Sequence, residues 1–256
     1  MMVQNIGVVG AGTMGSGITQ TCAVNGLSVV MHDMSNDLLE KGLKTIEHSL
    51  DRLVAREKLS NSDKSEALAR IRCSTELEAL SESELVVETA TENMDIKIPI
   101  FESLNQICGP DAILASNTSS LSLTTLAAAS GRPDKIIGMH FFNPVSLMKL
   151  VEIIRALQTS DKTYEVTESL TRTLGKEPIV VKDSPGFVVN RMLVPMINEA
   201  VFILYEGLAG ADEIDAAMNL GAKHPIGRLA LADMIGIDVC LYVMNVLLKE
   251  FGDSKF

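Results

Sequence analysis

The chain has 256 residues, enough for one large domain or two smaller ones with a sizeable hydrophobic core. Hydrophobic residues make up 46% of the sequence, yet no apolar run reaches the roughly 18 residues that a membrane-spanning helix needs. The net charge of −11 argues against nucleic acid as the main partner, although an anionic ligand would need only a few local basic residues.

The four cysteines, Cys22, Cys73, Cys108 and Cys240, lie far apart and form no CxxC pair. Cys22 and Cys240 fall within apolar helical patterns, which favours reduced core thiols over disulfides or metal ligands. The first predicted strand begins so close to the N-terminus that it leaves no room for a signal peptide. We therefore expect a cytoplasmic protein.

The first predicted unit combines two strands and a helix. A buried strand is expected over residues 5–9, a helix over 13–24 and a second apolar strand over 27–31. Between the first strand and the helix lies Gly10-Ala11-Gly12-Thr13-Met14-Gly15, and Asp33 follows the second strand. Strand, glycine triplet, helix, strand and acid in this order are typical of a dinucleotide-binding βαβ unit.

Each part of this pattern has a physical reason. Gly10 permits a tight turn, Gly12 lets the backbone approach a pyrophosphate, and Gly15 lets helix and strand pack closely. The helix N-terminus offers free N–H groups and partial positive charge to the phosphates, so we expect residues 10–15 to line the cofactor. Asp33 would accept hydrogen bonds from the adenosine ribose and repel a 2′-phosphate, which predicts NAD rather than NADP.

The chain then continues as alternating strands and helices. A long helix is expected over residues 36–58, with basic side chains near its end that either form a solvated face or receive phosphates, and a polar hairpin follows at 59–63. Further strands are expected at 71–74, 85–88, 112–115, 136–142, 149–154 and 177–181, and further helices at 95–107 and 161–174. This alternation predicts a doubly wound, largely parallel sheet.

The pattern changes at residues 182–186, after which only helices are expected, over 188–206, 211–220 and 229–250. The last of these is apolar nearly all round and must be covered on every side. A helical domain this small is not large enough to cover it alone, so we expect a second subunit. We therefore predict an α/β fold. It comprises a Rossmann-type NAD-binding domain over residues 1–182 and an all-helical domain over residues 183–256 that serves substrate binding and homodimerisation.

Four polar residues are the candidates for chemistry: Ser119, His140, Glu152 and Asn190. His140 ends one predicted strand and Glu152 lies inside the next, so the two strands are expected to be antiparallel neighbours with both side chains on one face. A carboxylate in apolar surroundings needs a partner, and a paired histidine suits a general base near neutral pH. The sequence leaves open whether this pair is catalytic or a buried structural pair.

The other histidines, His32, His48 and His224, rank lower as catalytic candidates. His32 precedes the predicted ribose-binding acid, His48 falls within the long helix, and His224 lies in a Lys-His-Pro turn. No two histidines have the spacing of metal ligands, so we expect no metal.

The sequence resembles the L-3-hydroxyacyl-CoA dehydrogenase family from Ile6 to Phe256, and most closely its bacterial 3-hydroxybutyryl-CoA dehydrogenases. The first motif that carries the resemblance is the glycine-rich run 10–15, which many Rossmann proteins share. Three more specific ones follow: Ala115-Ser116-Asn117-Thr118-Ser119-Ser120-Leu121, His140-Phe141-Phe142-Asn143-Pro144 and Asp183-Ser184-Pro185-Gly186-Phe187-Val188-Val189-Asn190-Arg191.

The resemblance implies NAD-linked interconversion of an L-3-hydroxyacyl-CoA and its 3-oxoacyl-CoA. It implies His140 as the catalytic base with Glu152 as its partner, and Ser119 and Asn190 as residues that hydrogen-bond the reacting oxygen and the thioester. Further positions match the family's cofactor site, namely Glu92, Lys97, Asn117, Ser119 and Asn143, and its coenzyme A site, namely Ser49 and Arg56 on the long helix.

Members of the family usually continue past the position of Phe256 with a basic, glycine-rich tail that closes over the active site. The sequence departs from the family here and leaves open whether this protein has such a tail. The sequence leaves two other functions open. One is a sister dehydrogenase acting on a hydroxy acid that carries no coenzyme A, and the other is a non-catalytic protein that keeps the fold, as lens crystallins of this family do. Intact Ser119, His140, Glu152 and Asn190 argue against the second.

Overall fold

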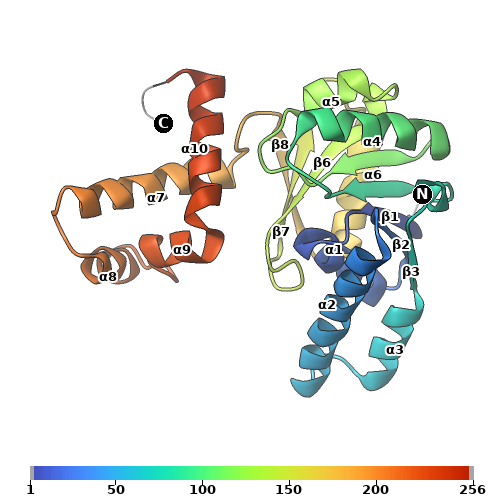
Figure 1. The fold of residues 1–256 in the computed structure, drawn as a ribbon, viewed down its shortest axis with the longest axis horizontal. Helices are drawn as coiled ribbons and strands as arrows, with labels where there is room; N and C mark the ends of the chain where they lie inside the picture. Colours follow the sequence, from blue (N-terminus) through green and yellow to red (C-terminus); the bar gives the residue numbers. More distant parts are fainter. Residues whose placement is uncertain (1–2, 254–256) are drawn as a thin grey trace. The chain divides into compact units, whose positions relative to one another are not determined.

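The computed structural model describes residues 3–253 and divides into two compact units between Asp183 and Ser184. The first unit is built on an eight-stranded sheet with the strand order β3-β2-β1-β4-β5-β6-β7-β8 (Figure 1). Neighbouring strands are parallel, except that β6 and β7 are antiparallel. The strands are β1 (Asn5–Val9), β2 (Ser28–His32), β3 (Ile71–Ser74), β4 (Leu85–Glu88), β5 (Ile113–Ser116), β6 (Ile136–Phe141), β7 (Leu150–Arg155) and β8 (Glu177–Lys182).

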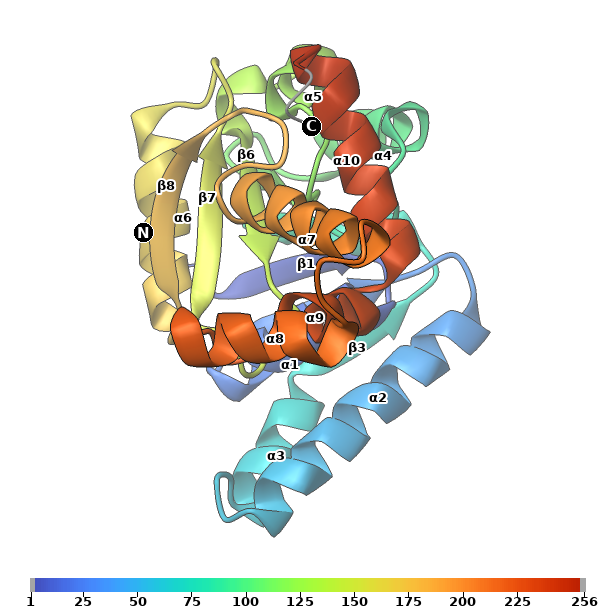
Figure 2. The same ribbon diagram turned by 90° about the vertical axis from the view of Figure 1, so that its left-hand side faces the viewer.

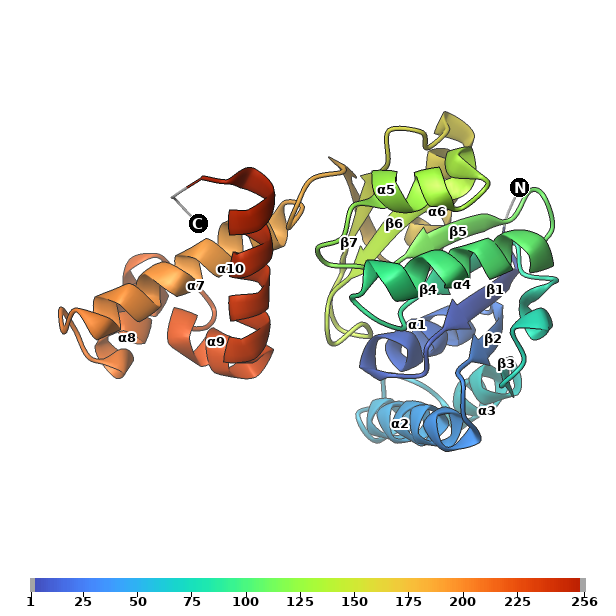
Figure 3. The same cartoon turned by 45° about the horizontal axis from the view of Figure 1, so that its top comes forward.

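Helices cover both faces of this sheet. Helices α1 and α6 lie on one face, and α4 and α5 lie on the other (Figures 1 and 3). The larger apolar core joins the first face to the sheet through residues such as Ile18, Met31 and Leu170. The predicted Rossmann-type sheet is therefore confirmed. The helices of this unit are α1 (Thr13–Val24), α2 (Asn36–Ala55), α3 (Asn61–Ala69), α4 (Met94–Ile107), α5 (Leu123–Ala129) and α6 (Asp161–Thr173).

The helix starts follow from polar residues in the sequence. In α2 to α6 a side-chain oxygen of the N-cap residue accepts a backbone N–H of the first turn, which satisfies one of the free donors there. These N-cap residues are Ser35, Ser60, Asn93, Ser122 and Ser160. Helix α1 differs, because its N-cap is Gly12 and no side chain caps it. The first N–H groups of α1 are thus left for a ligand.

Two short helices were not predicted from the sequence. The segment expected to be a polar hairpin at 59–63 is the start of α3, where Ser60 and Asp63 form a capping box. The helix predicted over 36–58 ends earlier, at Ala55. Helix α5 follows the serine-rich motif after β5, and its small side chains give no clear helical period.

The second unit contains α7 (Val189–Tyr205), α8 (Ala211–Gly221), α9 (Arg228–Ile235) and α10 (Ile237–Phe251) (Figure 2). The prediction of one helix over 229–250 was wrong, because Gly236 has φ +101° and separates two helices whose axes are bent by 96°. A helix cannot continue through a residue with that backbone conformation, which glycine alone adopts readily. The bend lets Ala232, Cys240, Val243 and Leu247 pack with Val194 of α7 in one core.

Apolar side chains also remain exposed on the second unit. Tyr205, Leu208, Ile237 and Leu241 are each at least 61% exposed. Within residues 3–253, no single helix is long and apolar enough to cross a membrane, and only the bent pair α9 and α10 passes that test when its two helices are taken together.

Candidate active site

The glycine-rich loop between β1 and α1 has the geometry that its sequence predicts. Gly10 has φ +101°, and its N–H donates to the carbonyl oxygen of His32 over 2.8 Å. A Cβ on Gly15 would lie 1.8 Å from the carbonyl oxygen of Gly10, so only glycine fits there. A Cβ on Gly12 would meet no atom within 4 Å. The backbone at Gly12 therefore faces open space, which fits the approach of a pyrophosphate.

Asp33 is fixed directly beside this loop. One of its carboxylate oxygens accepts the N–H of Ala11 and the other accepts the N–H of Met34, each over 2.7 Å. Thr13 and Met14 form the start of α1, so the six loop residues and the acid surround one helix N-terminus. This arrangement suits a dinucleotide whose phosphates meet the helix and whose ribose meets the carboxylate.

His140 and Glu152 form a buried pair across β6 and β7. The register places the two residues opposite each other on antiparallel strands, as the sequence predicted, and Nδ1 of His140 lies 2.7 Å from Oε2 of Glu152. The His140 side chain is 4% exposed and that of Glu152 is 1% exposed. A carboxylate can only accept a hydrogen bond, so the imidazole carries a hydrogen on Nδ1 and donates a hydrogen bond to Glu152.

Ser119 lies at the other nitrogen of the same ring. Its Oγ is 3.1 Å from Nε2 of His140. When the imidazole is neutral, Nε2 is the acceptor and the Ser119 hydroxyl is the donor. Ser119 is half-buried, unlike His140 and Glu152. Phe142 packs on the ring, with the two ring centroids 4.5 Å apart. Glu152, His140 and Ser119 thus form one hydrogen-bonded chain from a buried carboxylate to a half-buried hydroxyl.

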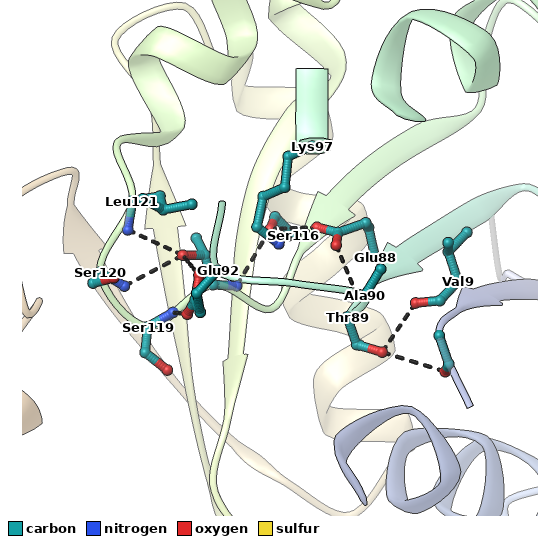
Figure 4. A network of polar contacts seen from close by, with 12 residues as sticks. Val9, Glu88, Thr89, Ala90, Glu92, Lys97, Ser116, Ser119, Ser120 and Leu121 are labelled. Carbon is teal, nitrogen blue, oxygen red and sulfur yellow. Dashed lines mark hydrogen bonds and ion pairs between the residues drawn. The ribbon is translucent and has the colours of Figure 1, made fainter. Parts of the chain in front are cut away.

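The loop that carries Ser119 is held by Glu92. The carboxylate of Glu92 accepts the hydroxyl of Thr118 over 2.6 Å and the backbone N–H of Ser119 (Figure 4). Asn117, two residues earlier, uses its side-chain oxygen to accept the N–H of Phe141 over 2.9 Å. This bond ties the end of β5 to the strand of His140. Glu92 and Asn117, which the resemblance assigns to the cofactor site, therefore also fix the catalytic candidates relative to each other.

Lys97 is placed differently from what its predicted role suggests. Its side chain is 1% exposed and forms an ion pair with Glu88, which is fully buried. Sequence reasoning missed Glu88, although a signal close to the one used for Glu152 was present: an acid in an apolar strand, here directly after Leu85-Val86-Val87. Its partner lies on the helix that follows.

The remaining predicted residues lie on other elements. Asn143 is exposed in the loop after β6, at the cis peptide bond to Pro144. Ser49 is half-buried within α2, and Arg56 is exposed at the end of that helix. Asn190 is half-buried in the first turn of α7, in the second unit. No group of three metal-ligating side chains occurs in the part of the chain that the structure describes.

A dinucleotide loop with an acid after the second strand, in the same sheet as a hydroxyl–imidazole–carboxylate chain, defines a Rossmann-type nicotinamide-dependent dehydrogenase. Family comparison is more specific. Residues 5–184 match the model of the 3-hydroxyacyl-CoA dehydrogenase NAD-binding domain, and residues 186–256 match that of the 3-hydroxyacyl-CoA dehydrogenase C-terminal domain. The chain belongs to the 3-hydroxyacyl-CoA dehydrogenase family and is an NAD-dependent enzyme, as the sequence resemblance predicted.

Individual relatives agree with this placement. The chain is 48% identical to a 3-hydroxybutyryl-CoA dehydrogenase of Bradyrhizobium diazoefficiens, over 100% of the chain and 87% of the relative. It is also 48% identical to a 3-hydroxybutyryl-CoA dehydrogenase of Clostridioides difficile, over 98% of the chain and 89% of the relative. The crystal structure of (S)-3-hydroxybutyryl-CoA dehydrogenase from Ralstonia eutropha superimposes with a TM-score of 0.96 at 57% identity, covering 99% of the chain and 89% of that structure.

Proposed function

We propose that this enzyme interconverts a short-chain L-3-hydroxyacyl-CoA, such as 3-hydroxybutyryl-CoA, and the corresponding 3-oxoacyl-CoA. The observation that supports this reaction most directly is the chain Ser119–His140–Glu152, with distances of 3.1 Å and 2.7 Å. It joins a hydroxyl that can contact a substrate oxygen to a base and to the carboxylate that orients this base. The short acyl chain is inferred from the names of the bacterial relatives.

In this proposal His140 is the general base and acid. In the oxidative direction Nε2 removes the proton of the substrate 3-hydroxyl, and Ser119 hydrogen-bonds the same oxygen and holds it in line. Glu152 stabilises the imidazolium that forms, because its negative charge lies 2.7 Å from Nδ1. Bound NAD supplies the hydride acceptor. In the reductive direction the imidazolium returns its proton to the oxygen at C3.

Further residues take the roles that the family motifs assign. Residues 10–15 and Asp33 hold the dinucleotide, and Glu92, Asn117 and Asn143 line its nicotinamide half. Lys97 is not assigned to this lining, because its side chain is 1% exposed and ion-paired with Glu88. Ser49 and Arg56 contact the coenzyme A moiety, for which the exposed guanidinium of Arg56 offers a charge complementary to phosphate. For Asn190 the motif assigns a hydrogen bond to the substrate oxygen or the thioester, and this assignment rests on the motif alone.

We also propose a homodimer formed through the helical unit, because large apolar side chains such as Tyr205 and Leu208 stay 85% and 75% exposed on the single chain. The four cysteines are unpaired thiols, which supports a cytoplasmic location.

The test is NADH oxidation with a series of 3-oxo substrates. We expect turnover with acetoacetyl-CoA, slower turnover as the acyl chain lengthens, and none with free acetoacetate at equal concentration. Arg56→Ala should raise the KM for acetoacetyl-CoA and leave the Kd for NADH unchanged. Equal turnover of the free acid would show a dehydrogenase of substrates without coenzyme A. NADH binding without any turnover would show a non-catalytic family member.

A further inference from the structure

A second buried carboxylate, Glu88, lies at the carboxyl end of β4 and has no role in the reaction described above. One of its oxygens accepts the N–H of Ala90 over 2.8 Å, and the other accepts the hydroxyl of Ser116 over 3.0 Å and the ammonium of Lys97. Glu88 is 0% exposed and Lys97 is 1% exposed. One carboxylate thus joins the turn after β4, the end of β5 and helix α4 (Figure 4).

The stability of the fold is a weak reason for this arrangement. Removing two charges from water is unfavourable, and buried ion pairs are often no more stabilising than apolar residues of the same volume. The apolar run before Glu88 shows that the surroundings would accept such residues. The position of the carboxylate, rather than its contribution to folding, is therefore the property to explain.

The turn that Glu88 anchors, residues 89–92, contacts two parts of the active site. At its start, the N–H of Thr89 donates to the carbonyl oxygen of Val9 over 2.8 Å. The Thr89 hydroxyl lies 2.9 Å from the same oxygen and 3.3 Å from that of Gly10. At its end, Glu92 accepts the hydroxyl of Thr118 and the N–H of Ser119. The turn bridges the dinucleotide loop and the hydroxyl that faces His140.

We propose that Glu88 is a positioning residue that sets this turn, and through it both the dinucleotide loop and Ser119. Lys97 supplies the counter-charge to the buried carboxylate of Glu88. Ala90 and Ser116 are the two points at which the carboxylate fixes backbone and strand. The part of this proposal that concerns Ser119 rests on the proposed function, whereas the part that concerns the dinucleotide loop needs only NAD binding.

Two double variants separate positioning from mere stability. Glu88→Gln with Lys97→Met removes both charges and keeps an acceptor oxygen for the Ala90 N–H. Glu88→Met with Lys97→Met also removes both charges but leaves no acceptor. Because neither variant leaves an unpaired buried charge, we expect both to keep Tm within about 5 °C of the wild type, whereas Lys97→Met alone should lower Tm by roughly 10 °C. The exposed pair Glu40–Lys44 provides a matched control, Glu40→Gln with Lys44→Met.

Two properties are measured: the Kd for NADH by fluorescence of the bound nucleotide, and kcat with acetoacetyl-CoA. We expect the Gln/Met variant to stay within about threefold of the wild type in both. In the Met/Met variant the Kd should rise roughly tenfold and kcat should fall by roughly 10- to 100-fold, the effect of a small misplacement of reacting groups. When Ser119→Ala is also present, the Met/Met substitutions should cause no further loss of kcat, because that loss acts through Ser119. They should still raise the Kd for NADH.

Equal Kd and kcat values for the two double variants would overturn the proposal, since they would show that the acceptor oxygen does not matter. If the Met/Met substitutions lower kcat by the same factor with and without Ser119→Ala, Glu88 does not act through Ser119, and that part of the proposal is overturned. If the Met/Met variant does not fold, Ser116→Ala replaces it. For this variant we expect a lower kcat and an unchanged Kd for NADH. An unchanged kcat would contradict the proposal. A wild type that binds NADH but turns over no 3-oxoacyl-CoA would refute the proposed function. The predicted effect of Glu88 on the Kd for NADH could still be tested with such a protein.

Discussion

Glu152 lies directly opposite His140 in the only antiparallel strand pair of the described sheet, and the 2.7 Å contact between Oε2 and Nδ1 fixes one edge of the imidazole ring. The other ring nitrogen is left for Ser119 and a substrate oxygen. The pair is therefore expected to act as a single unit, which makes its mutational behaviour unusual.

We expect His140→Gln to lower kcat by about 10²–10⁴-fold, the range for losing a positioned acid–base group, with little change in the Kd for NADH. Glu152→Gln should also lower kcat, because the charge that stabilises the imidazolium is lost. Steady-state kinetics of the two single variants and the double variant measure this. The losses should be far from additive. A double variant whose loss equals the product of the single losses would contradict the pairing, and a fully active His140→Gln enzyme would contradict the assignment of the base.

Asp33 should decide between the two nicotinamide cofactors. The wild type is expected to show the higher kcat/KM with NADH, because the carboxylate would repel a 2′-phosphate. Asp33→Asn keeps an acceptor for the Ala11 N–H but removes the charge, so the ratio of kcat/KM for NADPH to that for NADH should rise roughly tenfold. Measuring kcat/KM with both cofactors tests this. A wild-type preference for NADPH of tenfold or more would show that the assignment is wrong.

His32 should make the protein sensitive to acid. Its burial lowers the pKa of the imidazole below the usual 6.5, and this effect outweighs the bond to Thr75 and the charges of Asp33, Glu76 and Glu78, which raise it. The unfolded chain then binds the proton at a higher pH than the folded protein does. The free energy of unfolding should therefore fall as the pH falls from about 7 to 5.

Urea unfolding at both pH values tests this expectation. The variant His32→Gln should lose part of the pH dependence, whereas His48→Gln, at an exposed position of α2, should keep all of it. An identical pH dependence for the wild type and His32→Gln would exclude His32 as the source.

The exposed apolar side chains of the second unit should support a dimer. Leu241 on α10 is 61% exposed, and Leu241→Lys should convert a micromolar solution from dimer towards monomer, because a charge in an apolar interface lacks a partner. Leu157→Lys serves as the control, since Leu157 is 89% exposed on the first unit. Sedimentation equilibrium measures both. A wild type that sediments as a stable monomer at this concentration would rule the dimer out.

Much of the first unit could be predicted because local patterns and global fold agree. The glycine triplet and Asp33 form one continuous stretch with one structural solution, and the strands of His140 and Glu152 are joined by a loop too short for a crossover. Their register then followed from the need to bury both side chains on one face. In each case the deciding contacts lie within one βαβ unit or one hairpin.

The features that could not be predicted depend on single residues or on distant contacts. One glycine, Gly236, breaks a segment whose apolar pattern continues on both sides, and no periodicity reveals the positive φ. The capping box of α3 was mistaken for a turn, because serine and aspartate favour both. The ion pair of Lys97 with Glu88 depends on how α4 packs on the sheet, which no motif records.

The reversal of β7 also affects how the site is assembled during folding. His140 and Glu152 are 12 residues apart, whereas Ser119 is 21 residues from His140 and Ala11 is 22 residues from Asp33. Closing a shorter loop loses less chain entropy. Because parallel neighbours need a crossover and antiparallel ones need only a hairpin, the base and its carboxylate form a self-contained local module. Ser119 and the dinucleotide loop are brought to that module only by contacts between residues further apart along the chain.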